Sequence, residues 1–389
     1  MFELVEIIDF RNIDCNLQTM PKRRGIFLCS VLKPIDEPRM LERMALSIVK
    51  GTNEPIYLFG QKPSADLPNS ALLTYFPQDS FNRLSIKRLL IHLKIFIKLL
   101  KVKPKVIIPN THEILLVIIV YKILFGGKVI YDIQENYYKN IRYSEAFIKP
   151  LRLLIAEYVR IKEVTLAPLI DHFILAESCY AQELKFIKAR FTILENKYSS
   201  RVNTTIKRNT TGLKFLFSGT LAQETGVFEC IELITKLQQI KTDITLVIIG
   251  HTPKTAVLNR LQREFESKHF ISLIGGSKPV SHSAIVEAIL NANIGILAYE
   301  EREHTKNRIP TKLFEYQALG LPILSQANRT WNDKLIKNNS LITDLASCNP
   351  QQLLQECQKL NSQPGQPVET SFWRLEEELF NNLIINTIT

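Results

Sequence analysis

The segment 307–322, NRIPTKLFEYQALGLP, carries the residues best suited to bind an anionic ligand. Pro310 stands where a helix would begin and Gly320 where it would end, and these are positions that proline and glycine favour. Free N–H groups at the start of a helix attract negative charge, and Arg308 and Lys312 lie beside them in the sequence. We expect this helix start to bind a diphosphate.

Glu315 lies on the same predicted helix, where a carboxylate can accept hydrogen bonds from both hydroxyls of a ribose. Two further turns follow predicted strands and contain glycine, at Gly250 and at Gly275. Glycine lets the backbone approach a ligand closely, although a lone glycine equally marks an ordinary turn. The residues alone therefore leave open a capped helix with a solvated charged face.

The stretch Arg308–Pro322 resembles the donor-binding motif of family 4 glycosyltransferases of the GT-B type. Phe217–Val227 resembles the glycine turn of that family beneath the donor phosphates, and Val129–Tyr137 resembles its strand and acidic loop. The resemblance extends from Gly25 to about Leu383. It implies a nucleotide-sugar donor bound by Gly219, Thr220, Gly250, Gly275, Arg308, Lys312, Leu313 and Glu315.

The sequence departs from the family pattern at four positions. Thr220 and Thr225 stand where many members carry an arginine and a lysine that clamp the pyrophosphate. Asn307 replaces the first acid of the paired-glutamate motif, and Gln134 stands where a histidine often lies near the reacting sugar. We expect the two basic residues at the helix start to supply the missing charge.

Acceptor-side residues are expected on loops that follow strands of the first half. Candidates for deprotonating the acceptor and binding sugar hydroxyls are His112, Glu113, Asp132 and Glu135, which are residue types able to move protons. The resemblance also implies that the loop with Lys33, Asp36 and Arg39 borders the acceptor. Asp132 equally suits the cap of a turn, and Glu113 the start of a helix.

No metal or other cofactor is expected. The sequence contains no Asp-x-Asp element that would hold Mg²⁺ or Mn²⁺ against a diphosphate, and no zinc-type spacing of His and Cys. Helix N-termini and basic side chains can stabilise a departing diphosphate instead.

Short apolar runs alternate with helical patterns along the whole chain, which predicts α/β architecture with parallel sheets. The predicted strands are 25–32, 56–59, 106–108, 129–131 and 172–175, and then 214–218, 245–250, 271–274, 294–297 and 322–325. The main predicted helices of the first half are 39–50, 83–101, 114–124 and 147–166. We predict two Rossmann-like, doubly wound parallel-sheet domains that face a central cleft, which is the GT-B fold.

The domain boundaries follow from changes in composition. A polar segment at 197–211 separates an acceptor-side domain, 1–196, from a donor-binding domain, 212–366. A region rich in Gln, Ser and Pro then precedes a final helix, so residues 367–389 are expected to pack back toward the first domain.

The chain of 389 residues has a formal net charge of +11, which suits an anionic partner. Nucleic acid is not expected, because the motifs typical of such binding are missing from the sequence. Six scattered cysteines and the lack of a 20-residue apolar run favour a cytoplasmic protein. The basic, apolar segments 83–101 and 139–162 suit either ordinary amphipathic helices or peripheral contact with an anionic membrane.

The predicted function is transfer of a sugar from a nucleotide-sugar donor to a glycan or lipid-linked acceptor in cell-envelope or exopolysaccharide synthesis. The family precedent implies a retaining reaction. A catalytically silent GT-B protein that binds a nucleotide sugar or glycan, and a UDP-sugar epimerase, remain alternatives.

Overall fold

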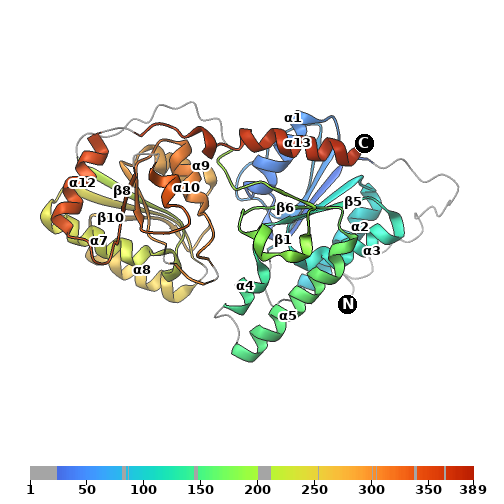
Figure 1. The fold of residues 1–389 in the computed structure, drawn as a ribbon, viewed down its shortest axis with the longest axis horizontal. Helices are drawn as coiled ribbons and strands as arrows, with labels where there is room; N and C mark the ends of the chain where they lie inside the picture. Colours follow the sequence, from blue (N-terminus) through green and yellow to red (C-terminus); the bar gives the residue numbers. More distant parts are fainter. Residues whose placement is uncertain are drawn as a thin grey trace.

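The computed structural model describes residues 24–80, 85, 87–143, 148–199, 212–252, 254–299, 301–303, 305–336, 340–362 and 365–389. Its described part contains two parallel β-sheets, one in each half of the chain (Figure 1). This confirms the predicted α/β architecture. The predicted linker, 197–211, lies outside the described residues from position 200 onward.

The first sheet has the strand order β3-β2-β1-β4-β5-β6-β7. Its strands are β1 Ile26–Pro34, β2 Ile56–Gln61, β3 Leu73–Gln78, β4 Val106–Pro109, β5 Lys128–Ile133, β6 His172–Leu175 and β7 Phe191–Ile193. The second sheet has the order β10-β9-β8-β11-β12-β13. Its strands are β8 Leu213–Thr220, β9 Ile244–His251, β10 Ile271–Gly276, β11 Ile294–Leu297, β12 Ile323–Gln326 and β13 Ser340–Thr343.

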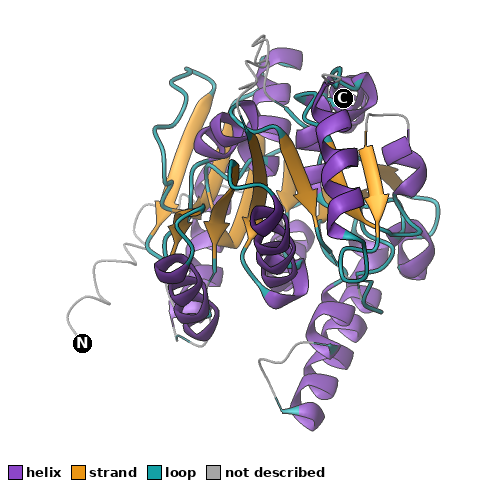
Figure 2. Cartoon of the chain, turned by 90° about the vertical axis from the view of Figure 1, so that its left-hand side faces the viewer, coloured by secondary structure: helices purple, strands orange, loops and turns teal. Residues whose placement is uncertain are grey.

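Helices pack on both faces of each sheet, where they form separate apolar clusters. Figure 2 shows helices on either side of strands in the half that faces the viewer. In the first half they are a π-helical turn, Arg39–Ala45, and α1 Leu46–Gly51, α2 Lys87–Val102, α3 Leu115–Phe125, α4 Tyr137–Arg142, α5 Lys149–Leu166 and α6 Tyr180–Glu183. In the second half they are α7 Val227–Ile240, α8 Thr255–Ser267, α9 His282–Leu290, α10 Thr311–Ala318, α11 Asn332–Ile336, α12 Pro350–Ser362 and α13 Arg374–Ile388. No helix in the described residues is long and apolar enough to cross a bilayer.

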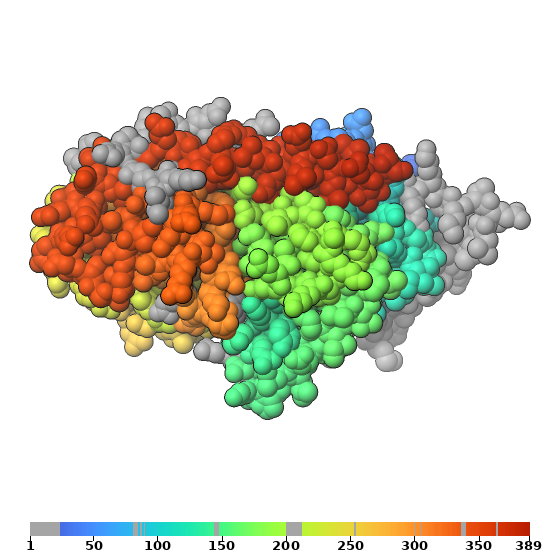
Figure 3. Space-filling view, in the orientation of Figure 1, coloured from blue at the N-terminus to red at the C-terminus, as the bar shows by residue number. Residues whose placement is uncertain are grey.

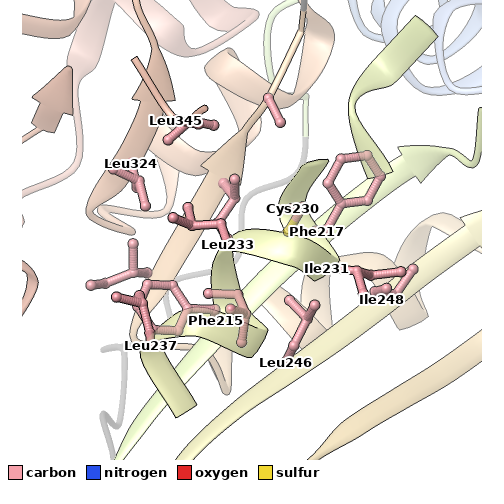
Figure 4. Packing of buried hydrophobic residues seen from close by; sticks show 14 of the residues in the cluster. Phe215, Phe217, Cys230, Ile231, Leu233, Leu237, Leu246, Ile248, Leu324 and Leu345 are labelled. Atoms are coloured by element: carbon pink, nitrogen blue, oxygen red, sulfur yellow. The ribbon is translucent and has the colours of Figure 1, made fainter. Parts of the chain in front are cut away.

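Apolar side chains fill the space between sheet and helices. On one face of the second sheet, Phe215 and Phe217 of β8 and Leu246 of β9 pack against Leu233 and Leu237 of α7 (Figure 4). Because the middle of this sheet is buried on both faces, its central strand β11 (IGIL) is apolar throughout instead of alternating in polarity. The rigid sheets fix where their connecting loops lie.

The last helix, α13, crosses back onto the first half of the chain (Figures 1 and 3). Trp373, Phe380 and Ile384 are buried in the same apolar cluster as Ile26 of β1. The Glu377 carboxylate accepts hydrogen bonds from Ser47 Oγ at 2.9 Å and Lys50 Nζ at 2.7 Å. The core of the first half is thus completed by the end of the sequence.

Candidate active site

A cavity of about 630 Å³ lies between the two halves of the chain. Loops that follow β1 and β5 line it on one side, and the first turns of α9 and α10 line it on the other. Its charged and polar walls include Lys33, Asp36, Glu37, Glu42, Arg43, Gln134, Glu135, His282, Lys312 and Glu315. Ligands of open parallel sheets bind in such a place, beyond the carboxyl ends of the strands.

Helix α10 presents Lys312 and Glu315 to this cavity. The two residues are three apart, so they share a helix face, and Lys312 Nζ donates to Glu315 Oε2 at 2.7 Å. Burial alone would raise the pKa of Glu315, but Lys312 and His282 outweigh it and lower the pKa to about 2. Glu315 is therefore an ionised carboxylate that can accept hydrogen bonds from a ligand.

His282, the first residue of α9, joins the two walls of the cavity. Its Nδ1 lies 2.9 Å from Glu42 Oε1 of the first half, and its Nε2 lies 3.5 Å from Glu315 Oε1. Burial would lower the pKa of His282, yet the two carboxylates raise it to about 9. At neutral pH the imidazolium therefore links Glu42 to Glu315.

Three glycines stand side by side at the ends of neighbouring strands: Gly219 of β8 pairs with Gly250 of β9, which pairs with Gly275 of β10. A Cβ on Gly250 would lie 1.7 Å from the Gly219 carbonyl oxygen, and one on Gly275 would lie 2.4 Å from that of Gly250. These two glycines are needed for backbone packing. A Cβ on Gly219 would instead meet Lys312 Cε at 3.5 Å, at a φ of +127°. Gly219 thus leaves space beside Lys312.

The turn after Gly219 is closed by a threonine hydroxyl. Thr225 Oγ1 donates to the Thr220 carbonyl at 2.8 Å and accepts from the Ala222 N–H at 3.2 Å. The side chain of Thr220 is exposed. Thr225, at one of the two positions where the sequence resemblance predicts a basic residue, thus stabilises its own turn.

Arg308 and Leu313 point away from the α10 face that lines the cavity. Arg308 Nη2 donates to Asn140 Oδ1 of α4 at 2.5 Å, and its guanidinium lies 5.9 Å from the ring centre of Tyr180. Leu313 is fully buried in the core of the second half. Arg308 therefore connects the two halves, and Leu313 holds α10 in place.

The opposite wall carries Lys33, Asp36 and Glu135. Lys33 Nζ donates to Glu37 Oε1 at 3.1 Å and also to Gln134 Oε1. Asp36 Oδ2 accepts from the backbone N–H of residue 64 at 2.8 Å. Glu135 Oε2 accepts a hydrogen bond from the side-chain amide of Asn140 at 2.5 Å. These three predicted residues are brought together around one space.

Asp132 and Arg39 form a buried ion pair behind this wall. Arg39 Nη2 lies 2.7 Å from Asp132 Oδ1, and both side chains are at most 1% exposed. Gln134 Nε2 donates to Asp132 Oδ2 at 2.7 Å. The carboxylate of Asp132 is thus engaged by Arg39 and Gln134, and it orients Gln134 toward Lys33.

His112 and Glu113 face α2 and α5. His112 Nδ1 lies 3.0 Å from Lys162 Nζ, and burial together with Lys162 and Arg88 lowers the pKa of His112 to about 3. Glu113 pairs with Arg88 at 2.5 Å. The structure does not bring these two candidates to the cavity wall.

The family model for glycosyl transferases group 1 matches residues 203–370. This segment contains the Gly219 turn, His282 and α10. Residues 203–370 form a group 1 glycosyltransferase domain. The predicted resemblance is confirmed at the level of group 1 glycosyltransferases over this segment, and the chain is a glycosyltransferase.

Solved structures similar to this glycosyltransferase cover nearly its whole length. Sucrose-phosphate synthase from Thermosynechococcus elongatus is 12% identical, with a TM-score of 0.63 over 94% of this chain and 99% of that one. WaaG, a glycosyltransferase involved in lipopolysaccharide biosynthesis, is 13% identical, with a TM-score of 0.59 over 93% and 95%. HepE of Anabaena, in complex with UDP and glucose, is 13% identical, with a TM-score of 0.55 over 94% and 99%. At such identities the likeness shows the fold, and it confirms the GT-B prediction.

No curated protein sequence matched this glycosyltransferase. In the described residues, no group of three His, Cys, Asp or Glu side chains is placed to hold a metal ion.

Sequence reasoning missed His282 and Glu42 of this glycosyltransferase. Neither belongs to the motifs of the resemblance, and they lie 240 positions apart. The one available signal was the position of His282 shortly after the Gly275 turn. Its partner becomes visible only when the two halves face each other.

Proposed function

We propose that this glycosyltransferase moves a sugar from a nucleotide-sugar donor to a hydroxyl of a glycan or lipid-linked acceptor inside the cavity. One observation carries the proposal: the ionised carboxylate of Glu315, 2% exposed, faces the cavity between Lys312 and His282. Burying a carboxylate between two cations costs desolvation free energy, and such groups with shifted pKa values cluster at functional sites.

The donor binds to the second half in this proposal. Glu315 accepts hydrogen bonds from the ribose hydroxyls, while Lys312 and the start of α10 attract the diphosphate. Gly219 leaves room for a phosphate beside Lys312, and Gly250 and Gly275 keep the strand ends close together. The structure of HepE is described with UDP, so UDP is the first nucleotide to test.

The acceptor enters against Lys33, Asp36 and Glu135. The acceptor oxygen forms a bond to the anomeric carbon of the sugar, whose bond to the diphosphate oxygen breaks, and configuration is retained. We assign the acceptor proton to Glu135, because it alone of the four predicted catalytic candidates lines the cavity. Asp132 and Arg39 are positioning residues behind it.

The departing diphosphate is stabilised by Lys312 and the α10 N-terminus, without a protein-bound metal. Turnover is therefore expected to persist in EDTA. The reaction would belong to cell-envelope or exopolysaccharide synthesis at the inner face of the cytoplasmic membrane.

The test is a thermal-shift screen against UDP, GDP, ADP and their sugar conjugates in EDTA. A ligand at 100 times its dissociation constant stabilises a fold by about 2.7 kcal/mol. We expect one nucleotide to stabilise the native chain and the Glu287→Gln control, whose exposed glutamate lies on α9. Glu315→Gln is expected to lose this response. Absence of any response from the native chain would refute the donor site.

A catalytically silent nucleotide-sugar binder is the second candidate, because the Thr225 hydroxyl is engaged by its own turn. Donor binding without turnover on any glycan or lipid-linked acceptor would favour it. Conversion of a UDP-sugar without acceptor would instead identify an epimerase.

A further inference from the structure

Helix α5 exposes a stripe of large apolar side chains to solvent. Leu151, Leu154, Tyr158 and Ile161 recur at intervals of three and four residues, so they lie on one face of the helix. Leu154 is 70% exposed, Tyr158 61% and Ile161 63%. Since its opposite face is buried through Ala156, Val159 and Leu166, α5 is apolar on both sides, which is unusual for a surface helix.

The neighbouring helix α3 has the same character. Leu116, Val120, Ile123 and Leu124 are exposed on one side of it, and Ile123 is 66% exposed. The other side is buried through Leu115, Ile118 and Ile119, and α3 contacts α5. Single exposed apolar residues are ordinary, but a clustered set marks an interaction surface.

Basic side chains accompany the stripe. Helices α4 and α5 together carry six basic residues, Lys139, Arg142, Lys149, Arg152, Arg160 and Lys162, against the two acids Glu157 and Glu163. Of the acids, Glu163 is buried and Glu157 is paired with Arg142 at 3.5 Å. Lys139 is itself paired with Glu183 at 2.7 Å, and Arg160 lies 3.7 Å from Glu163. Basic residues still outnumber acids, and Lys149 is exposed at the start of α5, so the region has a net positive charge that complements an anionic surface.

We propose that the outer face of α5, with the adjoining face of α3, docks on the anionic headgroups of a lipid bilayer and places its apolar side chains among the upper acyl chains. An apolar stripe flanked by lysine and arginine is the pattern of helices that lie in a membrane interface. Helices α4 and α5 form the protrusion at the lower edge of the molecule, where such a surface can reach a flat bilayer (Figures 1 and 3).

This surface is coupled to the cavity through α4. Tyr138 of α4 donates to Glu157 of α5 at 2.9 Å, and Arg160 of α5 donates to Asn136 at 3.0 Å. At the other side of α4, the Asn140 side chain donates to Glu135 on the cavity wall and accepts from Arg308 of the second half. A docked α5 would therefore hold the acceptor side of the cavity near the bilayer.

The full-length chain is tested for co-sedimentation with vesicles of phosphatidylcholine, alone and mixed with phosphatidylglycerol. We expect binding to the mixed vesicles, and a partition coefficient about tenfold or more lower for Leu154→Glu/Ile161→Glu. Ile240→Glu, at an exposed site of α7 in the other half, is the control and should bind like the native chain. Lys149→Glu should weaken binding only to the vesicles that contain phosphatidylglycerol.

Native binding to neither vesicle, equal binding to both vesicles, or equal binding by the double variant would each overturn the proposal. So would a native dimer that the double variant converts to a monomer, because the face would then cover a second copy. Unchanged melting temperatures of the variants exclude misfolding. The docking surface extends the membrane location given under the proposed function. Donor-induced stabilisation is measured without lipid, so failure of vesicle binding and failure of donor binding are distinguishable.

Discussion

At the scale of residues, His282 joins the two walls of the cavity, because its ring contacts a carboxylate from each half, Glu42 and Glu315. The raised pKa of His282 means that the folded state holds its proton more tightly than the unfolded chain does. Its stabilising contribution is complete below pH 6.5 and is lost as the pH rises through about 9.

His282→Gln is therefore expected to lower the free energy of unfolding by roughly 3 kcal/mol at pH 6.5, because the buried carboxylate of Glu315 and the partly buried carboxylate of Glu42 lose their shared cation. Urea unfolding across the range from pH 6.5 to about 9 should show native stability falling toward that of the variant. Parallel pH profiles for the two proteins would show that the imidazole carries no such linkage.

Gly219→Ala tests the space beside Lys312. The backbone at Gly219 has a φ of +127°, and an alanine there is expected to cost about 1–3 kcal/mol of stability. Because the new methyl group enters the proposed phosphate space, donor affinity measured by calorimetry should also fall. Retained affinity in a destabilised but folded variant would place the phosphates elsewhere.

The residues predicted from sequence fall into two groups. Lys312, Glu315 and Gly219 were selected from local motifs, and the structure places Lys312 and Glu315 on the cavity wall with Gly219 beside Lys312. His112 and Asp132 were chosen by type and loop position, but their surroundings are set by distant residues such as Lys162 and Arg39. A sequence pattern contains no information about those partners.

At the scale of elements, the start of α10 is held by a carboxylate from the opposite half. Glu177, after β6, accepts a hydrogen bond from the Ile309 N–H at 3.1 Å. Burial raises the pKa of Glu177 to about 8. The folded state thus favours the protonated acid, and stability is lost as the pH rises from about 4.5 through 8.

Glu177→Gln keeps an oxygen that can accept the hydrogen bond from the Ile309 N–H, but the glutamine side chain does not titrate. Between pH 5 and 8 the native free energy of unfolding should fall by at most about 1.4 kcal/mol per pH unit relative to the variant. Chemical denaturation at several pH values checks this. A native slope equal to that of Glu177→Gln would mean that Glu177 stays ionised in the folded state.

Most central strands were predicted correctly, since long apolar runs identify them. The prediction missed β3, β7 and β13, which lie at or beside sheet edges. All three are only partly buried, and β7 and β13 are short. β3 contains Pro77, which argues against a strand in sequence reasoning. These segments are strands because they form hydrogen bonds with β2, β6 and β12, and their own hydrophobic pattern does not predict it.

At the scale of the whole molecule, α13 stabilises the half of the chain to which it is not adjacent in sequence. Phe380→Ala should lower the free energy of unfolding of the first half by about 3–5 kcal/mol, because a fully buried ring is lost. Hydrogen exchange should increase in β1 and α1 but not in β8 and β9. Leu379→Ala, half-exposed on the same helix, is the control, and equal effects of the two changes would contradict the assignment.

The chain passes between its halves at two points, and these points are tied to each other. The Tyr198 N–H donates to the Ser371 carbonyl at 2.9 Å, and the Trp373 N–H donates to the Tyr198 carbonyl at 2.8 Å. Topologically, the second half is an insertion whose two ends meet. It should therefore be separable as one uninterrupted polypeptide or exchangeable between relatives as a cassette. The first half, assembled from segments that precede and follow this insertion, would need a new peptide connection to exist alone.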